Sequence, residues 1–170
     1  MKRFLFLLLT VITLSASAQT SEPVLKFGFL SYDAVLKAMP EYAMVESSMK
    51  ELEEQYAAEQ KRVEDEFNKK YEEFLDGQRD FPQTILQKRQ SELQELLDKN
   101  IAFKKEGQRL LVEAREKAMQ PLKNRLAEAL ASVGSSNGFA FILNTDANAA
   151  PWMNITMGED VTDAVLKVLK

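Results

Sequence analysis

The sequence contains no cysteine and no histidine. Without cysteine no disulfide bond is available, so stability must come from packing or from oligomerisation. Without histidine the chain lacks the commonest general base, the commonest metal ligand and the usual pH switch. These absences remove the groups on which most catalytic and metal sites depend.

Residues 1–18 have the pattern of a secretory signal peptide. Lys2 and Arg3 form the positive start, an apolar stretch follows from Phe4 to Leu14, and Ala16-Ser17-Ala18 matches the small-x-small cleavage pattern. The alternative, a membrane anchor, needs about 20 apolar residues, and this stretch is well short of that length. We expect cleavage before Gln19 and export of the mature chain. The mature chain of about 152 residues then has a net charge of −6.

Residues 42–121 are predicted to form a long helical hairpin arm, with its tip at about residues 76–82. In the first helix, apolar residues follow the heptad spacing of a coiled coil; they are Val45, Met49, Leu52, Tyr56 and Val63. Gly77 suits a helix end and Pro82 suits the first turn of the next helix. Asp80 is the expected cap of that second helix, which we place from about Phe81 to Val133.

The charges of the two predicted helices favour an antiparallel pairing. Residues 42–75 have a net charge of −5, and residues 84–133 have a net charge of +3. Each exposed ion pair contributes only about 0.2–1 kcal/mol, so most single charges are expected to be simply solvated. The opposite sign of the two helices nevertheless supports a hairpin.

Two positions are predicted to act as hinges of the arm. Gly107 lies inside the second helix, where glycine costs about 1 kcal/mol relative to alanine, and the register places it opposite Met49 and Lys50. Pro121 removes the hydrogen bond to the carbonyl of Lys117 and should kink the helix between arm and body.

Residues 19–41 and 122–170 are expected to form a small body of strands and short helices. Residues 25–30 alternate like a strand, and Asp33 is the expected cap of the short helix that follows. A turn at Asn137-Gly138 precedes a second strand over residues 139–143, and a third is expected near residues 152–157. Asp160 then caps a final helix with an apolar stripe.

The body displays more apolar surface than a three-stranded sheet hides. About 70 residues without disulfides or metal are marginally stable alone. We therefore expect several bodies to bury one shared face formed by Phe27, Phe29, Phe139, Phe141 and Leu143. The alternative is that the final helix alone covers this face.

Three segments resemble the Skp/OmpH family of periplasmic chaperones. They are KFGFLSYDAVLKAMPEY leading into the long charged helix, FAFILNTDANAA near the other end, and EDVTDAVLKVLK at the C-terminus. The element Asp146-Ala147-Asn148-Ala149, the helix start Asp160-Val161-Thr162 and a proline near Pro121 match the family. The resemblance covers the whole mature chain, although any charged coiled coil resembles another.

The resemblance implies an α+β fold with a small β-strand body and a long antiparallel coiled-coil arm. It further implies a homotrimer in which three bodies form an oligomeric β-barrel. Three arms would enclose a cavity that holds unfolded outer-membrane proteins and prevents their aggregation before membrane insertion. No enzyme activity or cofactor is implied. The best-known members are strongly basic, whereas this mature chain is acidic, so we expect at most a weak contact with the membrane surface and no nucleic-acid partner.

Apolar residues near the tip are the predicted client contacts; they are Phe74, Phe81, Ile85 and Leu86. Their alternative role is to close the end of the hairpin. The alternative function is that of a coiled-coil adaptor of the cell envelope, in which the arm bridges two fixed partners. Suppression of aggregation for unrelated unfolded clients would favour the chaperone, and one folded ligand of defined stoichiometry would favour the adaptor.

Two short motifs are set aside. Ser47-x-x-Lys50 matches a motif of penicillin-recognising enzymes, but it lies within the heptad pattern and its partner motifs are missing. Asn144, Asp146 and Asn148 alternate like the start of a calcium loop, but the required glycine and glutamate are absent. Turn capping is the expected role of these three residues.

Overall fold

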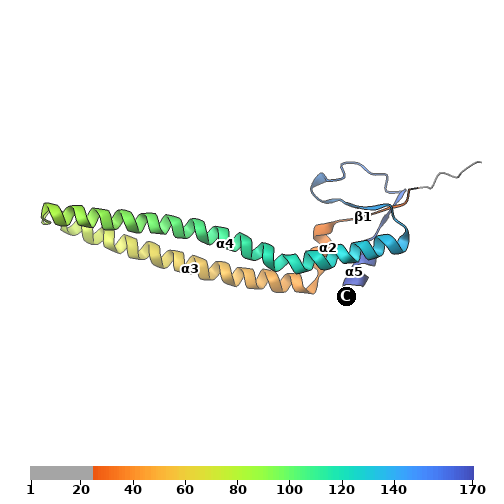
Figure 1. Ribbon diagram of the computed structural model, residues 1–170, viewed down its shortest axis with the longest axis horizontal. Coiled ribbons are helices and arrows are strands. Elements are labelled where there is room, and N and C mark those ends of the chain that lie inside the picture. The colour runs from red at the N-terminus through yellow and green to blue at the C-terminus, as the bar shows by residue number, and fades with distance from the viewer. Residues whose placement is uncertain (1–24) are drawn as a thin grey trace, which may run out of the picture.

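The computed structural model describes residues 25–170 and is mostly helical, with one small sheet. The elements in chain order are β1 (Phe27–Leu30), α2 (Tyr32–Ala38), α3 (Pro40–Gly77), α4 (Gln83–Asn137), β2 (Phe141–Asn144), the 3-10 helix η2 (Asp146–Asn148), β3 (Gly158–Asp160) and α5 (Thr162–Leu169). Figure 1 shows the long helices α3 and α4 extending side by side from a small body. The predicted signal peptide and its cleavage site lie outside the described residues.

Residues near the start of α3 contact the later part of α4, and residues further along α3 contact earlier parts of α4. The Asn100 side chain donates a hydrogen bond to the Val63 carbonyl oxygen at 3.1 Å. Nearer the body, Glu46 pairs with Arg115 and Glu41 pairs with Arg125. Most other ion pairs among the described residues join neighbours within one helix. Opposite charges therefore tie the two helices together mainly near the body.

The start of α4 differs from the sequence prediction. The helix begins at Gln83, not at Phe81, and Pro82 occupies the N-cap position without a side-chain cap. Asp80 instead belongs to the tip, where its N–H donates to the Gly77 carbonyl oxygen at 3.0 Å. Pro82 has an extended backbone (ψ 148°). The chain therefore becomes helical only after this proline.

The sheet is parallel and has the strand order β2-β1-β3. Phe27 pairs with Phe141 and with Gly158, so β1 is the central strand. The third strand was predicted too early, near residues 152–157, because that segment is rich in apolar residues. Only residues 158–160 pair with β1. Residues 152–157 instead belong to the connection before β3.

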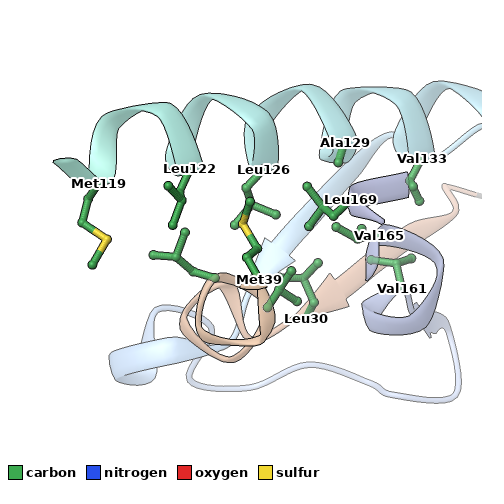
Figure 2. Close-up of a cluster of buried hydrophobic side chains, with 12 residues drawn as sticks. Leu30, Met39, Met119, Leu122, Leu126, Ala129, Val133, Val161, Val165 and Leu169 are labelled. Atoms are coloured by element: carbon green, nitrogen blue, oxygen red, sulfur yellow. The ribbon is translucent and has the colours of Figure 1, made fainter. Parts of the chain in front are cut away.

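The core of the body lies between α4, α2, α5 and the inner side of β1 (Figure 2). Buried residues of α4 recur at spacings of three and four and so form one apolar stripe; they are Met119, Leu122, Leu126, Ala129 and Val133. Val161 and Val165 face this stripe and are almost fully buried. Each large buried side chain contributes about 1.5–3 kcal/mol, so this cluster holds the body together.

The start of α2 is held by a segment that is distant in the sequence. Ser31, and not Asp33, is its N-cap, because the Ser31 hydroxyl oxygen accepts a hydrogen bond from Ala34 N–H. The Asp146 carboxylate accepts hydrogen bonds from the Ser31 hydroxyl at 2.6 Å and from Asp33 N–H at 2.8 Å. These two bonds lower the pKa of Asp146, with the Ser31 bond as the larger cause.

We predict that Asp146→Asn destabilises the body at neutral pH. A carboxyl group whose pKa is lowered by folding stabilises the fold above its unfolded pKa, and this stabilisation is lost as the pH falls through the folded value. The melting temperature of the variant should therefore lie below that of the wild type at pH 7. The difference in melting temperature should become small at a pH well below 3.8, the ordinary pKa of aspartate. An equal difference at both pH values would show that the charge of Asp146 contributes nothing.

Gly107 is buried between the two long helices and lies against Tyr56, not opposite Met49 and Lys50. The predicted register was therefore wrong by about two turns of α3, because heptad spacing alone does not set which turns meet. A Cβ atom at position 107 would come within 3.1 Å of Tyr56 Cδ1. The glycine thus allows the aromatic ring to pack closely against α4.

This contact predicts a coupling between Gly107 and Tyr56. Alanine in a helix normally gains about 0.4–1 kcal/mol over glycine, but here the added methyl group must displace the ring. Gly107→Ala should therefore change the free energy of unfolding little in the wild type. In a Tyr56→Ser background it should stabilise by the full amount, as measured by a double-mutant cycle in denaturant. The same gain in both backgrounds would contradict the packing role of Gly107.

Pro121 lies inside α4, which continues unbroken from Gln83 to Asn137. Figure 1 shows that α4 changes direction between the arm and the body, in the teal part of the ribbon around residue 120. Proline removes one backbone hydrogen bond and its ring crowds the preceding turn, so a bend is expected there. The roles of Gly107 and Pro121 as hinges remain predictions.

Candidate functional site

The outer face of the sheet is apolar and partly open to solvent. Phe27 and Phe29 of β1 point to the side opposite the buried residues Gly28 and Leu30, and both are half-buried. Phe27 stacks on Phe141 with ring centroids 5.6 Å apart. The Phe141 side chain remains 48% exposed. The sheet therefore presents aromatic surface that the helices within residues 25–170 leave uncovered.

Four of the five predicted interface residues share this outer face, and one does not. The register places Phe27 beside Phe141 and Phe29 beside Leu143, so all four lie on one side. Phe139 precedes β2 and packs against the core cluster of the body. The Lys26 ammonium group lies 4.8 Å from the centre of its ring. Gly138 ends α4 with a positive φ of 65°, and Phe139 follows it directly, before the start of β2 at Phe141.

The connection before β3 adds exposed apolar residues that the sequence analysis did not include. Trp152 is 82% exposed, and Ile155 and Met157 are 66% and 59% exposed. Large apolar side chains at this exposure are uncommon on a monomer when they lie near one another. The apolar character of residues 152–157 was recognised in the sequence, but it was interpreted as a third strand. Because only residues 158–160 pair with β1, residues 152–157 lie outside the sheet and these three apolar side chains are exposed.

The tip of the arm brings two of the four predicted client-contact residues together. The rings of Phe74 and Phe81 lie 6.5 Å apart, and Phe81 covers Gly77 so closely that a Cβ atom there would meet its ring at 2.4 Å. Ile85 is 41% exposed, and Leu86 is half-buried. Phe81 therefore helps to close the tip, while Ile85 remains accessible.

A cleft of 390 Å³ lies beside this aromatic pair. Its apolar lining consists of Phe74, Phe81, Leu93 and Leu96. Its charged lining consists of Lys70, Glu73, Arg89 and Glu92. Arg89 and Glu92 pair across one edge at 3.2 Å. The cleft offers apolar contact with a rim that carries no net charge.

No group of acidic side chains within residues 25–170 is placed to hold a metal ion. Asn144 and Asp146, which begin the calcium-like pattern, are used in hydrogen bonds. The Asn144 side-chain oxygen accepts from Tyr32 N–H at 3.2 Å, and Asp146 accepts from Ser31 and Asp33. In the part of the chain that the structure describes, no helix is both long and apolar enough to cross a membrane.

The described part of the chain combines a small sheet body with one long arm of two helices. The sequence profile of the family described as "Outer membrane protein (OmpH-like)" matches residues 26–169. The chain therefore belongs to the OmpH-like family. The predicted family relationship is confirmed.

A solved structure supports the same fold. The chain is similar to the crystal structure of a candidate OmpH-like outer membrane chaperone from Caulobacter crescentus, with a TM-score of 0.65 and 18% sequence identity. The likeness covers 87% of this chain and 86% of that chain. At this identity the comparison establishes the shared fold. No curated protein sequence matches the chain significantly.

Proposed function

We propose that the mature protein is a periplasmic holdase chaperone. It binds unfolded outer-membrane proteins in a cavity between its arms and prevents their aggregation before membrane insertion. The observation that carries this proposal is a long arm with exposed apolar side chains, joined to a body whose sheet has an open apolar face. Membership of the OmpH-like family supports a chaperone role in the periplasm. A client is then held by many weak contacts, whose combined avidity exceeds that of each one.

We further propose that the body assembles into a homotrimer through the outer face of its sheet. Both outer strands, β2 and β3, have an edge without a partner among residues 25–170. An open edge is a template for pairing with another chain. Joining bodies at these edges would form a barrel and bury Phe27, Phe29, Phe141 and Leu143 inside it.

The arms are proposed to bend at Gly107 and Pro121 and to contact clients near the tip. Support comes from the bend of α4 near residue 120, from the exposure of Ile85, and from the cleft beside Phe74 and Phe81. The two phenylalanines also close the tip, so they serve both the shape of the arm and its apolar surface. The acidic net charge of the chain argues for at most weak contact with a membrane surface.

The proposal is tested by light scattering of the mature protein with an unfolded β-barrel client. Wild-type protein should suppress the aggregation of several unrelated clients of this kind when they are diluted from denaturant. The size of the protein with and without client gives the number of subunits and the stoichiometry. Unchanged aggregation in the presence of the protein would contradict the chaperone function. Binding of a single folded partner without any effect on aggregation would favour an envelope adaptor instead.

A further inference from the structure

One side of the arm carries a continuous row of three hollows between α3 and α4. The hollow nearest the tip has a volume of 240 Å³, the next 370 Å³ and the one nearest the body 130 Å³. The first two share Phe67 and Leu97 in their linings, and the second and third share Lys104. The three hollows therefore form one surface, which we call the amide strip.

The floor of the amide strip is apolar and accessible. Tyr71, Leu97 and Ile101 are 45%, 39% and 59% exposed. Phe67 stacks on Tyr71 with ring centroids 6.0 Å apart. These side chains are available to an apolar partner without any rearrangement of the arm. The strip extends well beyond the tip residues to which the sequence analysis assigned client contact.

The polar lining of the strip consists mainly of uncharged amides, which are Gln60, Asn68, Gln90, Gln94, Asn100 and Gln108. Only Glu53, Glu64 and Lys104 bring charge to it. The cleft at the tip, by contrast, has four charged residues in its lining. The amide strip is therefore chemically distinct from that cleft.

Several of these amides keep hydrogen-bonding capacity. Within residues 25–170, the side chains of Asn68, Gln90 and Gln108 make no hydrogen bond to the protein. Gln60 and Gln94 each donate one bond to a neighbour on the same helix, at 2.9 Å, and keep their carbonyl oxygens available. An amide both donates and accepts, so such a lining suits a partner with unpaired backbone N–H and C=O groups.

We propose that the amide strip binds an extended, uncharged client segment in which apolar and polar residues alternate. Alternate side chains of an extended chain point to one side, so the apolar ones would enter the hollows while the amides bond the client backbone. From Glu53 to Phe74 the strip is about 32 Å long, which matches about nine or ten extended residues. A transmembrane β-strand has about 9–11 residues with this alternation. The inference rests on the proposed chaperone function and specifies how a client is recognised.

Fluorescence anisotropy with labelled peptides tests the pattern that the strip recognises. One peptide of about ten residues alternates valine with serine or threonine. The control peptide has the same composition with the valines grouped at one end. The wild-type protein should bind the alternating peptide more tightly than the grouped one. Equal affinity for the two peptides would overturn the proposed pattern.

Matched variants then locate the binding surface. Tyr71→Ser with Ile101→Ser should weaken binding of the alternating peptide roughly tenfold, because two exposed apolar contacts are lost. Met44→Ser with Val168→Ser removes apolar side chains of comparable exposure, 69% and 52%, outside the strip and should leave the affinity unchanged. Unchanged binding by the strip variant, or equal losses in both variants, would overturn the assignment.

A gain of binding separates recognition from any damage to the fold. Gln90→Glu with Gln108→Glu places two negative charges along the strip. A peptide with lysine at two of its polar positions should bind this variant more tightly than the wild type, and the gain should disappear in high salt. No gain for the lysine peptide would count against contact at these positions. Aggregation suppression should also be compared between the wild type and the strip variant. If both prevent client aggregation equally well, the strip is not the binding surface, while the proposed chaperone function still holds.

Discussion

The Phe141→Asp variant should be a monomer in solution, whereas the wild-type protein should be an oligomer. Phe141 lies on the outer face of the sheet, stacked on Phe27, and its side chain is 48% exposed in the single chain. A carboxylate there remains solvated in the monomer. In the proposed interface it would be buried without a partner, which costs several kcal/mol for each subunit. The molar mass from multi-angle light scattering decides between the two states.

A matched control makes this result specific to the sheet face. Val168 of α5 is 52% exposed and lies next to the buried Leu169. Val168→Asp places the same charge at a similar exposure away from the sheet, so it should leave the mass unchanged. Circular dichroism should show the same helix content in both variants, because α3 and α4 are untouched. A wild-type mass for Phe141→Asp would show that the subunits join through another surface.

Replacement of all four tip residues by serine should strongly weaken client retention, while moderate salt should change it little. The residues are Phe74, Phe81, Ile85 and Leu86. The chain is net acidic, so long-range attraction is not the main driver for acidic clients. Attraction between exposed charges is screened by salt, with a Debye length of about 10 Å at 0.1 M, whereas apolar burial is not. Aggregation suppression measured across a salt series gives both results.

Single variants separate client contact at the tip from closure of the tip. Ile85 is 41% exposed, so Ile85→Ser should weaken retention with little effect on the stability of the arm. Phe81 packs on Gly77 and beside Phe74, so Phe81→Ser should also loosen the tip, which hydrogen exchange of residues 74–86 would detect. A steep loss of binding with salt, together with an unaffected serine variant, would show that charge holds the client.

Local pattern predicted the long helices with useful accuracy. Heptad spacing over residues 45–63 and the predicted end at Gly77 placed the first helix close to its observed bounds of Pro40–Gly77. These features act within a few residues, because helix geometry and capping are local properties of the chain. The turn at Asn137-Gly138 is local in the same way, and Gly138 has the positive φ that its sequence indicated.

Predictions failed where a long-range contact selects among local options. Asp33 and Ser31 are both suitable caps. Asp146, which lies 115 residues after Ser31, accepts hydrogen bonds from the Ser31 hydroxyl and from Asp33 N–H. From the sequence alone, Gly107 is a destabilising glycine inside a helix. In the structure, it makes room for the ring of Tyr56. In both cases the deciding partner is far away in the sequence.

The sequence by itself determined the helix-tip-helix arm, the strand-forming segments at both ends and the family relationship, because each depends on residue types and spacing along the chain. The tertiary structure alone decided the parallel order β2-β1-β3, which brings Phe27, Phe29, Phe141 and Leu143 onto one open face and leaves Phe139 half-buried against the core cluster. It alone aligned the amides of α3 with those of α4 along one side of the arm. Periodicity specifies which face of an element is apolar, whereas the register between elements follows from packing of complementary side chains, and that packing exists only in the folded chain.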